Sequence, residues 1–226
     1  MSLAVAAEGD KPNGPRSRKG VRTRARLLDA AKQIFEETGF LDARISDIAE
    51  RAGLSHGSFY HYFDSKEEIF REIAEEVDGR LSAPLAAVIL DQSSHATPRE
   101  RIHEAMRRYF ESYREEAKII GVIEQVSRYD AQVGALRRAR HQHYSEQMAQ
   151  SIRQLQHHGL ADPTIEPAVA AAALGSMTTR FAESWLVDGA VECSFDEAVE
   201  QLTSLFVNAM KSNVDATEPR GRPKAR

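Results

Sequence analysis

The stretch Ile45–Lys66, ISDIAERAGLSHGSFYHYFDSK, carries the clearest structural pattern in this chain. Its first apolar residues recur at the i, i+3, i+4, i+7 spacing of one helix face, at Ile45, Ile48, Ala49 and Ala52. Gly53 follows the last of them, where a helix needs a left-handed cap that glycine adopts at the least cost. Ser55 then stands where a second helix needs an N-cap, and its hydroxyl can accept a free backbone N–H.

The second helix of this stretch is expected to dock on the first through Phe59, Tyr62 and Phe63, which return at i, i+3, i+4. Two short helices joined by about three residues around a glycine form a helix-turn-helix, whose second helix enters the DNA major groove. The residues that remain on the outside are short or planar polar groups suited to base edges and phosphates. They are His56, Gly57, Ser58, Tyr60 and His61. An ordinary surface hairpin would not need this run, so DNA binding is the favoured interpretation.

The stretch and its flanks resemble the signature of the TetR family of transcriptional regulators. The resemblance covers about a fifth of the chain, namely Gly39-Phe40, ISDIAERAGLS at 45–55, GSFYHYF at 57–63 and Ser65-Lys66-Glu67-Glu68. It implies an all-α fold, with an N-terminal three-helix helix-turn-helix domain and a C-terminal helical domain that binds a small ligand and dimerises. One departure is Arg44, where the family commonly has a threonine that caps the helix and contacts a phosphate. Arginine can reach a phosphate but cannot cap the helix.

The resemblance also places candidate DNA contacts on this stretch, with Ser55–Tyr62 in a major groove of double-stranded DNA. We expect Ser46, His56 and Ser58 near base edges, with Gly57 allowing close approach. The expected contacts with backbone phosphates come from Arg44, Tyr60, His61, Tyr62 and Lys66. In the family, the lysine that matches Lys66 touches the DNA backbone.

The composition is that of a soluble globular protein, with 42% hydrophobic and 28% charged residues in a chain of 226. No apolar run approaches the roughly 18 residues of a membrane span, and Met1–Ala7 is too short and uncharged for a signal peptide. The single cysteine, Cys193, excludes an internal disulfide and fits a reducing cytosol. We therefore expect a cytoplasmic protein with no membrane partner.

The charge is divided unevenly along the chain, although the net charge is −4. Residues 11–66 carry eleven Lys and Arg against seven Asp and Glu. Residues 67–218 carry fifteen against twenty-five, and the last eight residues add four basic residues and no acid. Such asymmetry indicates which end of the chain meets nucleic acid.

Four segments are expected: a disordered basic arm at 1–22, a helix-turn-helix domain at 23–66, a helical ligand-binding and dimerisation domain at 67–212, and a disordered basic tail at 213–226. Basic residues follow one another from Lys11 to Arg26 without an intervening acid, so this region can lie along phosphates or enter a minor groove. A merely solubilising tail is the alternative for the first ten residues. The first helix is expected over Thr23–Thr38, and Gly39 ends it.

The C-terminal domain has several marked helix starts. Capping boxes are expected at Ser65/Glu68, Thr97/Glu100 and Ser194/Glu197. Pro84 is expected to interrupt or restart the first of these helices, and residues 91–96 to form a polar loop. The Ala-rich helix at 167–187 and the last helix are candidates for a four-helix homodimer interface, or else for plain core.

A ligand pocket in the same domain is predicted from aromatic residues and methionines, which suit a small hydrophobic or amphipathic effector. The candidates are Met106, Tyr109, Phe110, Tyr113, Ile123, Met148, Met177, Phe181 and Trp185. Plain core is the alternative for each of them. Arg180, or an arginine of the central helix, is a candidate partner for an anionic head group.

Other constellations give no catalytic or metal site. Glu100 and His103 have the Glu-x-x-His spacing of di-iron bundles, but the chain offers no second copy. His141, His143, His157 and His158 are expected to be solvated on a long charged helix. We expect no cofactor and no metal. Residues 219–224, PRGRPK, resemble an AT-hook that enters the minor groove, with a solvated tail as the alternative.

The favoured function is a ligand-responsive transcriptional regulator, most readily a repressor that binds an inverted-repeat operator as a homodimer. A constitutive dimeric DNA-binding protein with no small-molecule inducer is the main alternative. A third hypothesis, an all-helical enzyme, requires a cluster of polar groups of shifted acidity, and the sequence shows none clearly. We therefore expect the chain not to be an enzyme.

Overall fold

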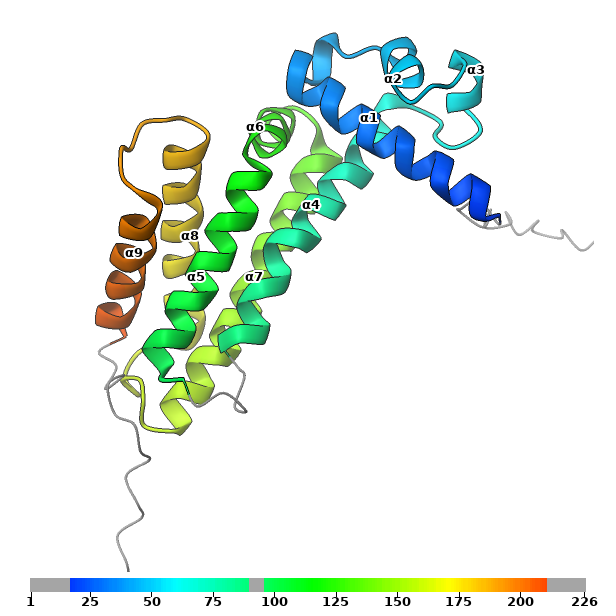
Figure 1. Ribbon diagram of the computed structural model, residues 1–226. Coiled ribbons are helices and arrows are strands. Elements are labelled where there is room, and N and C mark those ends of the chain that lie inside the picture. The colour runs from blue at the N-terminus through cyan, green and yellow to red at the C-terminus, as the bar shows by residue number, and fades with distance from the viewer. Residues whose placement is uncertain (1–16, 90–95, 211–226) are drawn as a thin grey trace, which may run out of the picture. The chain divides into compact units, whose positions relative to one another are not determined.

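The computed structural model describes residues 17–89 and 96–210, and every regular element in these ranges is an α-helix (Figure 1). The helices are α1 (Arg18–Asp42), α2 (Ile45–Arg51), α3 (His56–Phe59), α4 (Lys66–Ile89), α5 (Pro98–Glu115), α6 (Ala117–Val126), α7 (Ala131–His157), α8 (Pro167–Leu186) and α9 (Phe195–Ala209). The expected all-α class is confirmed. The chain divides into two compact units, Met1–Ile73 (unit 1) and Ala74–Arg226 (unit 2), and each is described by itself. The division lies inside α4, seven residues beyond the boundary expected at Lys66.

Some expected features lie outside the described residues. They are the arm as far as residue 16, most of the polar loop at 91–96, the tail at 213–226 and the AT-hook-like segment within it. None of the helices in the described ranges is long and apolar enough to cross a membrane.

Helix α1 begins at Arg18, earlier than the start at Thr23 that is expected from the sequence. Ser17 caps it, because the Ser17 Oγ accepts a hydrogen bond from the Gly20 N–H at 3.1 Å. The prediction that disorder extends to residue 22 and that the helix begins at Thr23 is therefore wrong. The expected end at Gly39 has a structural counterpart, since Gly39 takes a φ of 77° and breaks the helical backbone before Phe40 turns into the core.

The core of unit 1 is largely aromatic. The Phe35 ring meets the Phe70 ring edge-on at 5.1 Å between centroids, and Phe40 lies 4.8 Å from Phe70. Phe59 and Phe63 are fully buried in the same unit. This core fixes α2 and α3 against α1, which gives the helix-turn-helix its support.

Unit 2 is a helical bundle in which α5 packs against α6, α8 and α9, and α7 packs against α6 and α8 (Figure 1). The capping boxes at Thr97 and Ser194 are both complete, with side chain and backbone bonded in each direction. Helix α4 differs from expectation, because it continues through Pro84 to Ile89.

Candidate nucleic-acid interface and ligand cavity

The turn between α2 and α3 depends on Gly53. Its φ of 66° is left-handed, as expected, and the Leu54 N–H reaches back to the Ala49 carbonyl at 2.9 Å. The Arg26 guanidinium donates to the Ala52 carbonyl and so ties α1 to this turn. A Cβ at position 53 would lie 2.8 Å from the Arg26 Nη2, which is the end of a long side chain and could move aside, so the backbone angle is the feature that requires glycine.

Helix α3 is short, and its cap is not the one expected. Ser55 occupies the N-cap position, but its hydroxyl pairs with the Ser58 hydroxyl at 2.7 Å and makes no capping bond. The predicted capping bond of Ser55 is wrong, because Ser58 competes for the same hydroxyl from one turn along. Beyond Phe59 the chain continues as a turn through Tyr62.

The predicted DNA-contacting residues lie on α3 and on the segments before and after it in unit 1, and we call this set of residues the α3 surface. Those that are exposed are Arg44, Ser46, Ser55, His56, Gly57, Tyr60 and His61, while Ser58, Tyr62 and Lys66 are half-buried. The His56 ring meets the Tyr60 ring edge-on at 5.5 Å, and the Tyr60 ring also lies against Phe59 at 5.5 Å. Arg44 makes no side-chain cap, as expected. Tyr60 remains 48% exposed, so its hydroxyl end is presented outward from a supported ring.

Lys66 lies in a different environment from the other candidates. Its ammonium donates to the carbonyl oxygens of Phe40 at 2.7 Å, Ala43 at 2.9 Å and Leu41 at 3.2 Å. It also lies 4.7 Å from the centre of the Phe40 ring. An ammonium has three donors, so these carbonyls satisfy all of them. The expected contact between Lys66 and a phosphate would have to break one of these bonds.

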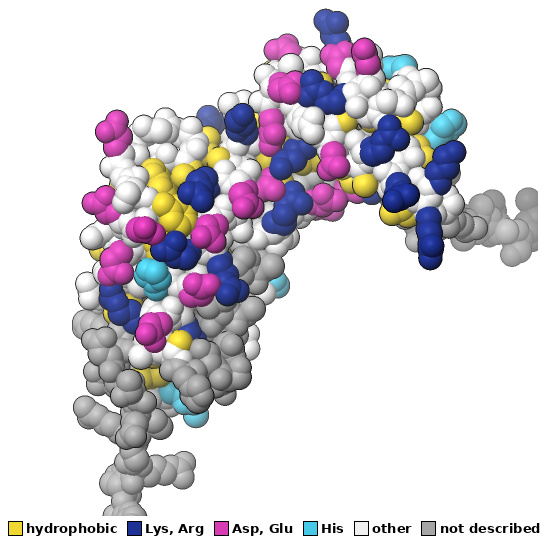
Figure 2. Space-filling model, in the orientation of Figure 1, with side chains coloured by type: hydrophobic (Ala, Val, Ile, Leu, Met, Phe, Trp, Pro, Cys, Tyr) yellow, Lys and Arg dark blue, Asp and Glu magenta, His cyan; other side chains and the backbone are white. Residues whose placement is uncertain are grey.

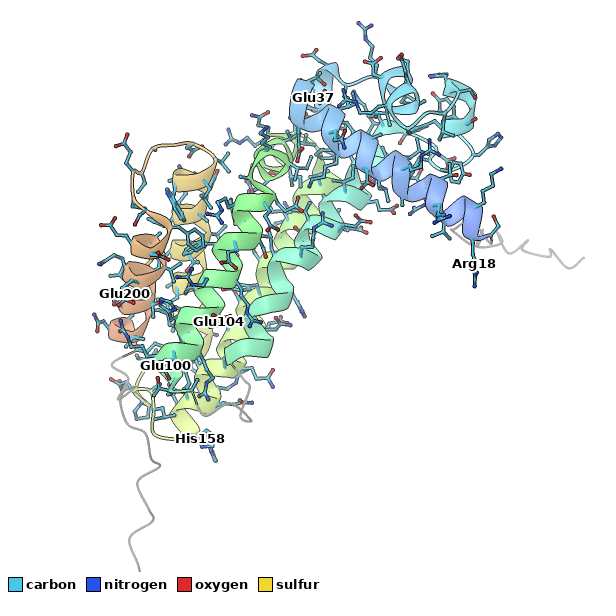
Figure 3. The ribbon with its side chains drawn as sticks, in the orientation of Figure 1. Arg18, Glu37, Glu100, Glu104, His158 and Glu200 are labelled. Atoms are coloured by element: carbon cyan, nitrogen blue, oxygen red, sulfur yellow. The ribbon has the colours of Figure 1, made fainter. Side chains whose placement is uncertain are left out.

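The arginines of α1 fall into two classes. Arg24 forms an ion pair with Glu72 and lies over the Phe63 ring at 4.7 Å, and Arg26 holds the turn, so these two help to hold unit 1 together. Arg18, Lys19 and Arg22 are exposed near the start of α1, where Figure 3 labels Arg18. Figure 2 shows several Lys and Arg side chains gathered on the surface of unit 1. Within the described part of the expected basic region, Arg18, Lys19 and Arg22 therefore remain available to contact phosphates.

One exposed ion pair joins the other end of α1 to α2. The Arg51 guanidinium donates two hydrogen bonds to the Glu37 carboxylate, at 2.6 and 2.7 Å, and Figure 3 labels Glu37. The bond to Glu37 raises the pKa of Arg51. The pair links α1 to α2, and neither of its residues belongs to the α3 surface.

Unit 2 contains a cavity of about 420 Å³, part of which is open to solvent. It draws residues from α4, α5, α6, α7 and α8, namely Leu81, Tyr109, Tyr113, Ile120, His141, Tyr144 and Thr179. Of the nine residues expected in a pocket, Tyr109 and Tyr113 line this cavity. The lining is thus richer in hydroxyl groups than the sequence analysis expected.

The other seven expected pocket residues are not among the residues that line this cavity. Met106, Phe110, Ile123 and Met148 are buried core, and Met177 is half-buried on α8. Phe110, Phe181 and Trp185 form an aromatic cluster, with the Phe110 ring 5.7 Å from the Trp185 ring and 6.0 Å from the Phe181 ring. These side chains fill space by packing on one another, which is the alternative that the sequence analysis left open.

Two polar residues of α7 were not predicted to line a cavity. His141 was expected to be solvated, and the structure corrects this because His141 lines the cavity. The Tyr144 hydroxyl is shielded from solvent, and burial raises the pKa of Tyr144. Both residues could have been found from their spacing, because positions 141, 144 and 148 share one face of a helix.

Arg180 is not part of the cavity. It is 65% exposed and pairs with Glu183 at 2.8 Å and Asp188 at 3.4 Å, and the bond to Glu183 raises the pKa of Arg180. The suggestion that Arg180 meets an anionic head group has no support from this position. His103 lies 3.8 Å from Glu200 on another helix, and the described residues contain no group of three or more His, Cys, Asp and Glu arranged to hold a metal ion.

Two family models match the chain. Residues 27–73 match the model described as "Bacterial regulatory proteins, tetR family". Residues 102–212 match the model described as "Transcriptional regulator EthR, C-terminal domain". Each match falls within one unit, and together they span both the α3 surface and most of the cavity.

Curated proteins and solved structures show the same likeness. The chain is 28% identical over 192 residues to the HTH-type transcriptional regulator UidR of Escherichia coli (strain K12), which covers 83% of this chain and 94% of UidR. It is 42% identical over 73 residues to the uncharacterized HTH-type transcriptional regulator YdgC of Bacillus subtilis (strain 168), covering 32% of this chain but only 37% of YdgC. The structure of the fatty acid degradation regulator FadR from Bacillus halodurans has a TM-score of 0.69 at 15% identity, covering 91% of this chain and all of that one.

Proposed function

The chain belongs to the TetR family of transcriptional regulators, and we propose that it is a homodimeric repressor released from its operator by a small molecule bound in unit 2. The observation that carries the proposal is the pairing of an exposed, polar α3 surface in unit 1 with a cavity in unit 2. The first suits DNA and the second suits an effector.

The α3 surface supports DNA binding through two kinds of contact. His56 and Ser58 carry groups that can hydrogen-bond base edges, and Gly57 offers no side chain that would keep the backbone away. Tyr60 and the exposed cations near Arg18 are suited to phosphates, which set the affinity and its dependence on salt. In this proposal the operator is read by α3, and the start of α1 strengthens binding to any sequence.

Dimerisation is supported by exposed apolar side chains on the last two helices. Val169 of α8 is 67% exposed and Leu205 of α9 is 51% exposed. Ala168, Ala172 and Ala173 are exposed near Val169, and small residues let helices of two copies approach closely. A dimer would present two α3 surfaces to half-sites about 34–36 Å apart along the DNA, which is one helical turn.

Helix α4 is the proposed route from the effector to the DNA. It carries residues of both units, and its Leu81 lines the cavity. An ion pair also ties α4 to the junction between α5 and α6, because the Arg80 Nε donates to the buried Glu116 carboxylate at 2.8 Å. A ligand that prefers a shifted position of α4 would disfavour the DNA-binding state, and this differential affinity is all that release requires.

The test is binding of the purified chain to the DNA upstream of its own gene, measured by fluorescence anisotropy at several salt concentrations. We expect salt-sensitive binding that a small carbonyl or aromatic compound reverses. Binding that no compound reverses would replace the proposal with a constitutive DNA-binding dimer.

A further inference from the structure

The face of α7 that turns into unit 2 carries polar side chains where a packed helix normally carries apolar ones. They follow the helical spacing in the order Arg137, His141, Tyr144, Gln147 and Ser151. Each is buried or half-buried. A buried polar group costs free energy unless it is hydrogen-bonded, so each of these side chains needs a partner.

Most of this run has a partner. The Arg137 Nη2 pairs with the buried Glu124 carboxylate at 2.5 Å, and the Ser151 hydroxyl donates to the Gln147 carbonyl at 3.1 Å. The Gln147 amide nitrogen pairs with His143 at 2.9 Å. Three polar atoms of the run are shielded from solvent with no hydrogen-bond partner among the residues that the structure describes, namely the Arg137 Nε, the Gln147 amide oxygen and the Tyr144 hydroxyl. Of these three residues, only Tyr144 is among those that line the cavity. The Tyr144 hydroxyl can therefore accept a partner that the described residues do not supply.

The position of the Tyr144 ring is set by its neighbours. A Cβ on Gly175 of α8 would lie 3.2 Å from the Tyr144 Cε1, so glycine makes room for the ring against α8. Burial, and then the neighbouring Tyr109, raise the pKa of Tyr144, so the hydroxyl keeps its proton in neutral solution. It is a fixed hydrogen-bond donor on the wall of the cavity.

We propose that the Tyr144 hydroxyl is the hydrogen-bonding anchor of the cavity, and that its ligand is a compact, uncharged molecule with a carbonyl-type oxygen on an apolar body. Calling this ligand the effector rests on the proposed function, but its binding does not. The lining contains hydroxyl groups, the His141 imidazole and apolar carbon, and no Lys, Arg, Asp or Glu is among the described residues that form it. A ligand carboxylate buried in the cavity would lack a guanidinium or ammonium partner among these residues. The 420 Å³ of the cavity includes space open to solvent, so the enclosed part gives room to a compact molecule.

The test uses Tyr144→Phe, which removes the hydroxyl and little else. Without ligand, this variant should melt no lower than the wild type, because the lost hydroxyl made no bond. Binding is measured by NMR of protein labelled with ¹³C in its tyrosine rings, with the Tyr144 signal identified by its absence from the variant. The probes are cyclohexanone, acetophenone and 1-indanone, with α-methylstyrene as the apolar match of acetophenone and benzoate as an anion.

In the wild type, the ketones should shift the Tyr144 signal, and acetophenone should bind more tightly than α-methylstyrene. Tyr144→Phe should reduce that preference by about tenfold, which corresponds to one lost hydrogen bond. The matched control is Tyr129→Phe, since Tyr129 is 57% exposed and is not among the residues that line the cavity, and it should leave the preference unchanged.

Three results would overturn the inference: no ketone shifts the Tyr144 signal, Tyr144→Phe keeps the preference, or benzoate binds more tightly than acetophenone. A fourth readout separates this inference from the proposed function. If a ketone binds through Tyr144 but leaves DNA binding unchanged, the proposed release fails and the anchor stands. If a ketone releases DNA equally well from the wild type and from Tyr144→Phe, the proposed function stands and the anchor fails.

Discussion

Replacing Lys66 with methionine tests whether this residue holds unit 1 together or contacts DNA. Methionine keeps an unbranched side chain of similar length but removes the ammonium. The carbonyl oxygens of Phe40, Leu41 and Ala43 would then lose their shared donor, and the Phe40 ring would lose the cation beside it. These carbonyls lie where α1 ends, so the perturbation acts on the junction that supports α2.

The size of the effect follows from the burial of the three bonds. A hydrogen bond to a charged group contributes about 1.5–3 kcal/mol when it is shielded from water. The bonds to Phe40 and Ala43 are partly buried and the bond to Leu41 is exposed, so most of the loss comes from two bonds, each weakened by solvent. We expect a fall in the free energy of unfolding of about 2–3 kcal/mol, or a shift of about 1 M in the urea midpoint of unit 1.

The assay is urea unfolding followed by circular dichroism, which reports helix in both units, and by fluorescence of the single tryptophan, Trp185, which lies in unit 2. The helical signal should begin to fall at lower urea in Lys66→Met. The matched control is Lys118→Met, because Lys118 is exposed on α6 and should tolerate the change. An unchanged urea midpoint, together with a fall of about 0.9 in the log–log slope of DNA binding against salt, would show instead that Lys66 contacts a phosphate.

Three further predictions concern other parts of the chain. Gly53→Ala should lower the free energy of unfolding by about 1–3 kcal/mol and weaken operator binding, because position 53 needs a φ of 66° that alanine adopts at a cost. Urea unfolding measures the first effect, and fluorescence anisotropy measures the second. His56→Ala should alter the sequence preference measured on a panel of operator variants, whereas Tyr60→Ala should weaken binding to all of them alike. Hydrogen bonds from the backbone N–H and then from the hydroxyl of Thr97 lower the pKa of Glu100. The contribution of the Glu100 carboxylate to the free energy of unfolding is therefore complete above its ordinary pKa of 4.5, and it is lost as the pH falls through the lower pKa of the folded state. Glu100→Gln should therefore lower the urea midpoint at pH 7, and this difference from the wild type should shrink as the pH is lowered below 4.5.

The features that the sequence predicts well are those set by neighbours along the chain. The turn at Gly53, the buried Phe59 and the capping boxes at Thr97 and Ser194 depend on residues within about one or two helical turns, and the structure confirms each. The start of α1 could also have been predicted from the sequence, because Ser17, a good N-cap residue, stands one residue before the helix. The many basic residues after it suggested an extended arm instead.

The features that the sequence could not predict depend on contacts between distant segments. Lys66 meets carbonyls 23 to 26 residues away, and Arg24 meets Glu72 across 48 residues. The cavity is a further case, because a cavity forms where side chains fail to fill space. Whether Phe110 or Tyr144 faces it depends on how each helix is rotated in the bundle. The pairing of Ser55 with Ser58 is local, but it depends on a competition between two hydroxyl partners that periodicity does not resolve.

Operator recognition by a dimer can be tested by selecting bound sequences from random double-stranded DNA with the purified chain. The account predicts an enriched inverted repeat whose half-sites lie about 10–10.5 base pairs apart, or a multiple of that spacing, since each copy of the dimer presents one α3 surface. It also predicts that His56→Ala enriches a different half-site. Selection that enriches no repeated motif, with binding that depends only on salt, would contradict the account.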